Sequence, residues 1–113
     1  MGIESRRQAR RSVPGMVEVF DTILEEPVGY LGNVSVGGML LIANRRLPDD
    51  ALFQFRFQLP DQAPGAPALE VGAHVLWQDK AGAPGQSWVG MRFLGLSPEA
   101  LQRLRLWVAQ AED

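Results

Sequence analysis

The sequence predicts a mainly β domain, a small antiparallel barrel closed by one C-terminal helix. From residue 16 onward, short apolar stretches alternate with turns rich in Gly, Pro and Asp, as in proteins built from short strands. Near the C-terminus the apolar spacing changes to that of a helix. A chain of 113 residues has room for one hydrophobic core, so we expect one domain.

The clearest strand covers residues 52–59. Phe53, Phe55 and Phe57 alternate there with polar side chains, which predicts one buried and one exposed face. The other expected strands are residues 16–20, 27–31, 39–42, 69–77 and 88–94. Between the second and third of these, residues 32–38 have the composition of a turn.

The C-terminal segment has the start signals of a helix. Ser97 is a good N-cap, Pro98 suits the first helical position, and Glu99 favours the positive end of the helix dipole. The apolar residues that follow recur at helical spacing: Leu101, Leu104 and Val108. We therefore predict a helix over residues 98–110.

Charge divides the chain into a basic tail and an acidic body. Residues 1–11 carry a formal charge of +3 from four arginines, and the rest of the chain carries −5. We expect residues 1–14 to be a flexible arginine-rich tail and residues 15–113 to be the barrel domain. Lys80 is the only lysine, so the positive charge is nearly all guanidinium, which binds phosphate with two parallel bonds and stacks on flat rings.

The composition argues against an enzyme, a metal site and a cofactor. Cysteine is absent, and His74 is the only histidine. The adjacent carboxylates at positions 25–26 and 49–50 fall in turn-rich stretches, where we expect them to be solvated rather than catalytic. His74 lies in an expected strand, where a structural or surface role is the simplest expectation.

The sequence also gives expectations about location and partners. No apolar run approaches the length of a membrane span, and the basic N-terminus has no apolar segment behind it, so we expect a cytoplasmic protein. A barrel that binds single-stranded nucleic acid needs aromatic and basic residues interleaved on one face. Here Arg56 and Arg92 are the basic residues of the strands, so we expect no DNA or RNA partner. A monomer or a weak dimer is expected.

Two short motifs stand out together. Arg7-x-x-x-Arg11 is preceded by Arg6, and Asn33-x-Ser35-x-x-Gly38 begins 22 residues after Arg11. Alone, the first motif is a solvated basic tail and the second is a hairpin turn. Together they resemble the RxxxR and (D/N)xSxxG signature of PilZ domains.

The resemblance extends over essentially the whole chain. Residues 89–97 look like the GxRF strand of PilZ domains and the Ser-capped helix that follows it. The resemblance implies a six-stranded antiparallel barrel with a C-terminal helix. It also implies that one or two molecules of cyclic di-GMP bind on the outer surface of the barrel. Trp77, at the end of the preceding strand, is either a barrel-mouth residue or a platform on which a guanine stacks.

The resemblance implies that the arginine motif supplies most of the positive charge at the binding site. Arg7 and Arg11 occupy the two motif positions, and Arg6 adds a contact to guanine or phosphate. Arg10 falls at a variable position of the motif and ranks behind them. Guanidinium groups suit this ligand because it offers two phosphates and two guanine edges that arginine binds with paired bonds.

The second motif implies the polar contacts. Asn33 and Ser35 take the polar edges of a guanine or a ribose–phosphate, and Gly38, with Gly37, lets the backbone approach the ligand. Many PilZ domains carry Asp where this chain has Asn33, so we expect weaker binding here, because an amide offers one neutral acceptor.

The expected function is that of a single-domain cyclic di-GMP effector or adaptor. Ligand binding orders the N-terminal arginine motif, and the ordered segment signals to an unidentified partner protein that controls motility, adhesion or exopolysaccharide. The alternative is a PilZ-type adaptor for type IV pilus assembly that does not bind the nucleotide. Such adaptors typically lack the arginine motif, which this chain keeps. Nucleic-acid binding would show a steep salt dependence and no sensitivity to Ser35.

Overall fold

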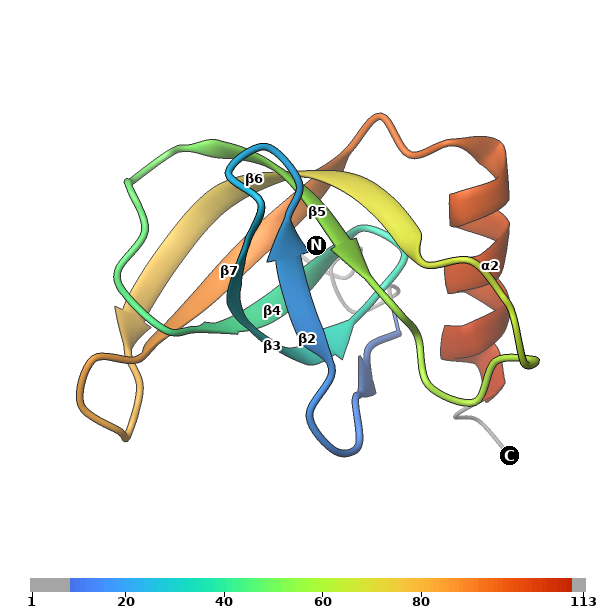
Figure 1. Ribbon diagram of the computed structural model, residues 1–113, viewed down its shortest axis with the longest axis horizontal. Coiled ribbons are helices and arrows are strands. Elements are labelled where there is room, and N and C mark those ends of the chain that lie inside the picture. Colours follow the sequence, from blue (N-terminus) through green and yellow to red (C-terminus); the bar gives the residue numbers. More distant parts are fainter. Residues whose placement is uncertain (1–8, 111–113) are drawn as a thin grey trace, which may run out of the picture.

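A computed structural model describes residues 9–110, which form a β-barrel with one helix at its end (Figure 1). The elements are, in chain order, β1 (Arg11–Ser12), β2 (Glu18–Asp21), β3 (Glu26–Val34), β4 (Gly38–Ala43), β5 (Leu52–Phe57), β6 (Leu69–Lys80), β7 (Ser87–Leu94) and α2 (Pro98–Ala109). Six strands close the barrel in the order β3-β2-β5-β6-β7-β4, with β4 paired back to β3 and all neighbours antiparallel. This confirms the predicted six-stranded barrel with a C-terminal helix.

The alternation in β5 produces the core as predicted. Phe55 and Phe57 are buried inside the barrel, and Phe53 is partly buried and stacked on Phe55, with 5.2 Å between ring centroids. The residues between them face outward and are exposed. Closed pairing leaves the six strands without a free edge, so one continuous core fills the barrel.

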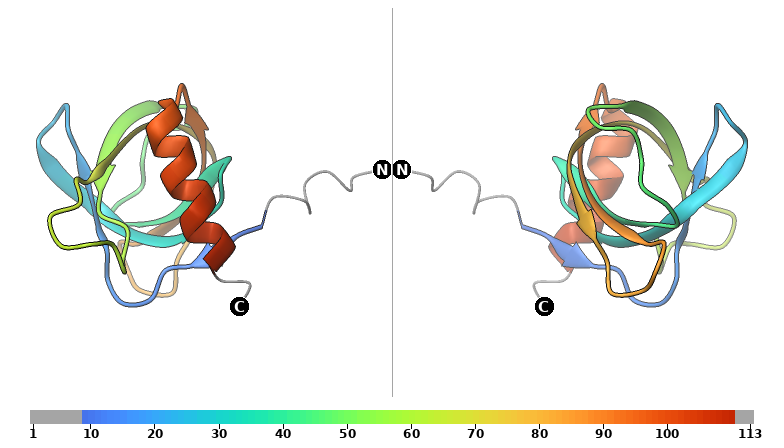
Figure 2. Two further views of the ribbon diagram at one scale, coloured as in Figure 1. Left: turned by 90° about the vertical axis from the view of Figure 1, so that its right-hand side faces the viewer. Right: turned by 90° about the vertical axis from the view of Figure 1, so that its left-hand side faces the viewer.

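Helix α2 covers one end of the barrel (Figure 2). Its first turn is capped as predicted, because the Ser97 Oγ accepts a bond from the Ala100 N–H at 3.0 Å and Pro98 occupies the first turn. Leu104 and Trp107, on the inner face of the helix, are buried, and the Trp107 indole N–H donates to the Pro60 carbonyl at 3.0 Å. The helix thus closes this end of the barrel, and its apolar face completes the core.

The segment between β4 and β5 covers the opposite end (Figure 2). Leu47 is buried there, and the Gln78 side-chain amide forms hydrogen bonds with both the N–H and the carbonyl of Leu47. The Gln78 Nε2 donates to the Leu47 carbonyl at 2.6 Å, and the Leu47 N–H donates to the Gln78 Oε1 at 3.0 Å. The amide thereby replaces the hydrogen bonds that a neighbouring strand would supply.

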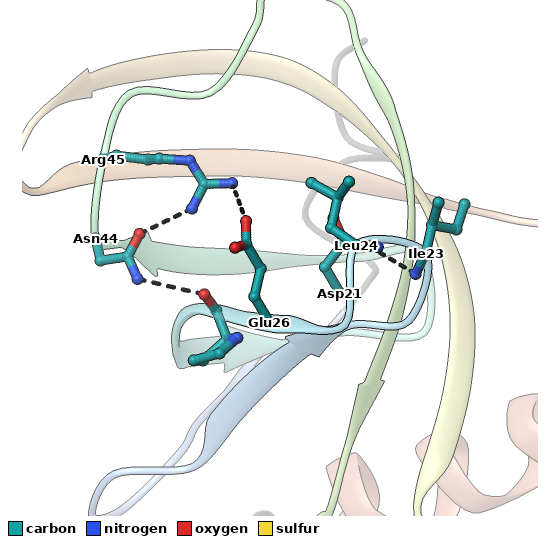
Figure 3. Close-up of polar contacts among 7 residues, drawn as sticks. Asp21, Ile23, Leu24, Glu26, Asn44 and Arg45 are labelled. Atoms are coloured by element: carbon teal, nitrogen blue, oxygen red, sulfur yellow. Dashed lines mark hydrogen bonds and ion pairs between the residues drawn. The ribbon is translucent and has the colours of Figure 1, made fainter.

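Two turns near this end are tied by carboxylates (Figure 3). The buried Asp21 carboxylate accepts bonds from the N–H groups of Ile23 and Leu24, at 2.8 and 3.0 Å, which fixes the turn between β2 and β3. Arg45, after β4, pairs with Glu26 at the start of β3 at 3.3 Å. These contacts hold the ends of the strands rather than form a site.

Two boundaries predicted from sequence were wrong. The expected turn at residues 32–38 is shorter, because β3 continues to Val34 and pairs with β4 and β1. Composition favoured a turn there, but cross-strand pairing overrides a local preference. The tail was expected to end at residue 14, yet Arg11 and Ser12 form β1, and Val13 is buried with its N–H on the Gly32 carbonyl. Within residues 9–110, no helix has the length and apolar character to cross a membrane.

Candidate functional site

Most of the predicted site residues within residues 9–110 lie together on the outer surface of the barrel, around the β3–β4 turn and the neighbouring parts of β6 and β7. Arg10 immediately precedes β1, which pairs with the last residues of β3 and thereby places Arg10 over the β3–β4 turn. Its Nη1 donates to the Ser35 Oγ at 3.4 Å. Arg6 and Arg7 lie outside the described residues.

Arg10 carries a charge without an acidic partner in the part of the chain that the structure describes. The surrounding protein removes water from its guanidinium, and this desolvation lowers the pKa of Arg10. Arginine stays protonated even so, because its ordinary pKa lies far above neutral pH. A partly desolvated cation that bonds only a hydroxyl is a favourable place for an anion to bind.

Ser35 shapes the turn between β3 and β4. It is buried, and its Oγ accepts bonds from the N–H groups of Gly37 and Gly38 at 3.2 and 3.1 Å. The hydroxyl also lies 3.4 Å from the Gly38 carbonyl, to which it donates. These three bonds fill the donor and both acceptor positions of the hydroxyl, so the 3.4 Å contact from Arg10 is weak, and the structure gives Ser35 a role in holding the turn. A direct contact from Ser35 to a ligand stays a prediction.

Gly38 owes its lack of a side chain to the barrel. A Cβ at Gly38 would lie 2.1 Å from the Met91 carbonyl oxygen on β7. The resemblance to PilZ domains implied that this glycine makes room for a ligand, whereas the structure shows that β7 itself needs the space. Gly37 lies in the turn, and its carbonyl accepts from the Phe93 N–H at 2.9 Å.

Asn33 offers an acceptor that no described residue uses. It lies at an irregularity in the β3–β4 pairing, opposite Leu40, and its Oδ1 is buried without a hydrogen-bond donor in residues 9–110. A buried acceptor left unpaired costs about 1–3 kcal/mol. A ligand that brings an N–H group to this atom recovers that cost.

Trp77 forms a flat apolar surface beside Asn33. A bulge in the pairing of β6 with β7 turns it outward, and 52% of its surface is exposed. Its ring lies against Gly90, where a Cβ would fall 2.1 Å from the indole Nε1. Gly90 therefore seats the ring flat on β7 and leaves the outer side of the ring open to stacking.

Two adjoining hollows lie among these residues. The larger, of about 520 Å³, is lined by Ser35, Gly37, Gly38 and Arg92, and the smaller, of about 170 Å³, is lined by Asn33, Leu40, Trp77 and Gly90. Arg10, Leu76 and Met91 line both. None of the carboxylates in residues 9–110 lines either hollow, so Arg10 and Arg92 give the site a positive charge.

Arg11 lies elsewhere. Its guanidinium stacks 3.8 Å from the centroid of the Trp107 ring and donates to the Trp107 carbonyl at 2.7 Å. Asp61 completes the set, with 3.6 Å between the charged groups. The structure thus places Arg11 against the end of α2 and away from the residues of the second motif. A ligand contact by Arg11 stays a prediction, while Arg10, which ranked lower, lies in the hollows.

Sequence reasoning did not assign Leu40, Leu76 or Gly90 to the site, and it left Arg92 as either a neighbour of the ligand or a solvated residue. A glycine inside an apolar strand signals a close approach of another group, and this signal was present at Gly90. The outward position of Arg92 follows from its alternation with Met91 and Phe93. Leu40 and Leu76 give no such signal, because outward leucines are common on barrels.

Comparison with known proteins identifies the family. The family model for the PilZ domain matches residues 4–110. No curated protein matches the sequence. Three solved structures share the fold, and all three are less than 20% identical to this chain.

The first is the inhibitor of motility MotI/DgrA of Bacillus subtilis, with a TM-score of 0.76 and 14% identity over 95% of this chain and 50% of that chain. The second is YcgR of Escherichia coli in complex with c-di-GMP, with a TM-score of 0.73 and 19% identity over 95% of this chain and 46% of that chain. The chain therefore spans about half the length of these two proteins.

The third is the PilZ domain of E. coli YcgR with c-di-GMP, with a TM-score of 0.70 and 18% identity over 95% of this chain and 91% of that domain. The family match over nearly the whole chain agrees with the six-stranded barrel, the C-terminal helix and the two motifs. The chain belongs to the PilZ domain family.

Proposed function

We propose that this chain is a cyclic di-GMP receptor whose ligand binds over the β3–β4 turn, between Arg10 and Trp77. The observation that carries the proposal is the pairing of an unneutralised cation, Arg10, with an unsatisfied buried acceptor, the Asn33 Oδ1. The ligand carries phosphates for the first and guanine N–H donors for the second. The c-di-GMP named with E. coli YcgR, a protein of the same fold, supports this ligand.

The orientation of the two described arginines favours one alignment of the arginine motif. The RxxxR spacing fits Arg6 with Arg10 as well as Arg7 with Arg11. Arg10 lines both hollows, whereas the guanidinium of Arg11 is occupied by Trp107. We therefore assign Arg6 and Arg10 as the motif pair, with Arg7 as an additional contact.

The proposed output is a change in the N-terminal segment. The strand pairing of β1 is short, with two residue pairs, Arg11 with Val34 and Ser12 with Asn33. A ligand with two negative charges draws the preceding arginines onto the barrel, and the segment with its bound nucleotide forms a new surface for a partner protein. Motility is the output we favour, since one protein of this fold is an inhibitor of motility.

Calorimetric titration with cyclic di-GMP tests the proposal, with GTP and GMP as controls. We expect saturable binding at micromolar affinity or better, with one or two molecules per chain. Arg10→Ala should weaken binding roughly tenfold or more, because a charge-assisted bond contributes about 1.5–3 kcal/mol.

Arg56→Ala is the matched control, because Arg56 is an exposed strand arginine that lines neither hollow. It should bind like the unmodified protein. Absence of binding by the unmodified protein would refute the proposal and favour an adaptor that works without the nucleotide.

A further inference from the structure

The two hollows have different sizes and share one boundary. The smaller, of about 170 Å³, falls below the range of about 300–1,000 Å³ that is typical of small-molecule sites. It has room for part of a nucleotide, with Trp77 beside it for stacking. Arg10 lines both hollows, so a ligand that fills both has its middle at Arg10 and one end in each.

The chemistry of cyclic di-GMP matches this arrangement. The ligand is a ring that carries two phosphates, with one guanine on each side. On the function proposed above, the phosphates lie at Arg10, and one guanine enters the smaller hollow, where the Asn33 Oδ1 accepts from its N–H groups. The second guanine then lies in the larger hollow, where Arg92 supplies the only guanidinium of residues 9–110 besides that of Arg10.

Arg92 is available for such a contact. It lies on the outer surface of β7, between Gly38 on β4 and His74 on β6 in the pairing of the strands. Gly38 offers the Arg92 side chain no side-chain partner. The imidazole of His74 bonds the carboxylate of Asp50, and the side chain of Arg92 forms no ion pair or hydrogen bond with any of residues 9–110.

We infer that Arg92 determines the base specificity of this site by binding the O6 and N7 edge of the second guanine. Guanine presents two acceptors on that edge, which match the two parallel N–H groups of a guanidinium. Adenine presents an amino donor in place of O6, which repels the guanidinium. This inference rests on the proposed function, and it makes a prediction that the proposed function alone does not.

The test compares cyclic di-GMP with 3′,3′-cyclic GMP–AMP, which has the same phosphate ring and one guanine fewer. Dissociation constants are measured by calorimetry for the unmodified protein, Arg92→Ala and the control Arg56→Ala. The unmodified protein and the control should prefer cyclic di-GMP by roughly tenfold, as expected for one paired arginine–guanine contact. In Arg92→Ala this preference should fall close to one, because the hybrid ligand places its single guanine at Asn33.

Each outcome separates this inference from the proposed function. Equal weakening of both ligands in Arg92→Ala would overturn the inference, because it would mean that Arg92 acts on the shared phosphates. Unchanged binding in Arg92→Ala, or no preference in the unmodified protein, would also overturn it. In these cases a loss of binding in Arg10→Ala would leave the proposed function intact. Failure of the unmodified protein to bind either ligand would refute the proposed function itself. Thermal melting of each variant confirms that the fold is retained.

Discussion

Arg10 and Arg11 are neighbours in the chain, but they lie in different environments. Arg11 has a ring, a carbonyl and a carboxylate around its guanidinium, and only 18% of its side chain is exposed. Arg10 bonds one hydroxyl and has no acidic partner among the described residues. The difference follows from a short strand, whose successive side chains point to opposite sides.

The comparison shows how one basic run serves two purposes. A guanidinium whose donors and charge are already matched stabilises the fold and has little left for a ligand. A guanidinium whose charge is unmatched adds little to the stability of the free protein and gains partners when an anion binds. We therefore assign Arg11 to the stability of the domain and Arg10 to the ligand.

The exposed Trp77 and the buried Trp107 give the largest expected contrast in stability. Trp107→Ala removes a buried side chain and the ring beneath Arg11, so we expect a loss of about 3–5 kcal/mol in the free energy of unfolding. Trp77→Ala, on the ligand side, should lower that free energy by less, because about half of the ring is exposed, and should weaken cyclic di-GMP binding roughly tenfold, the value of one stacking contact.

Urea denaturation and calorimetric titration measure the two effects. Trp107→Phe, which keeps a ring under Arg11, should lose less stability than Trp107→Ala. Equal destabilisation by the alanine variants at both tryptophans would remove the distinction between the two sides.

Replacement of Arg11 tests the stabilising side directly. Arg11→Ala loses a cation–π contact and a charged hydrogen bond to the end of α2. The free energy of unfolding should therefore fall by about 2–3 kcal/mol. Arg105→Ala is the control, because Arg105 is exposed on the same helix. Denaturation curves that coincide for the two variants would mean that the Arg11 contacts carry no net stability.

Gly38 sharpens the comparison, because it lies in the motif yet serves the barrel. Gly38→Ala places a Cβ against the Met91 carbonyl, and we expect overpacking to cost about 1–3 kcal/mol of stability. Gly82→Ala, in the open loop after β6, has no atom within 4 Å of the new Cβ and should be nearly neutral. A stable Gly38→Ala protein that fails to bind cyclic di-GMP would show instead that Gly38 makes room for the ligand.

Asn33 gives the smallest expected change in stability. Asn33→Leu removes an unpaired buried acceptor, and such a replacement is nearly neutral or raises the free energy of unfolding by about 1 kcal/mol. Binding of cyclic di-GMP should weaken at the same time, since the acceptor for guanine N–H groups is gone. A marked loss of stability would show that the Asn33 amide has a structural partner.

Much of the fold follows from local patterns. The alternation in β5 predicted which phenylalanines enter the core, and Ser97 with Pro98 predicted the start of α2. The length of β3 did not follow, because Gly32 and Asn33 favour turns locally and become strand residues only through pairing with β4 and β1.

The site followed from the sequence in its location more than in its details. The two motifs predicted where the polar groups gather. Two arginine pairs have the same spacing, however, and only the direction of each side chain separates Arg10 from Arg11. The seat of Trp77 on Gly90 depends on a bulge between β6 and β7, which aligns residues that are distant in sequence.

The most direct test of this division of roles is the melting temperature of Arg10→Ala and Arg11→Ala, each with and without saturating cyclic di-GMP. A ligand that binds only the folded protein raises the melting temperature. Arg10→Ala should melt like the unmodified protein without ligand and gain less from its addition than the unmodified protein does. Arg11→Ala should melt at a lower temperature without ligand and still be stabilised by it. The reverse pattern, in which Arg11→Ala loses the response to ligand with its own stability unchanged and Arg10→Ala keeps it, would contradict the account.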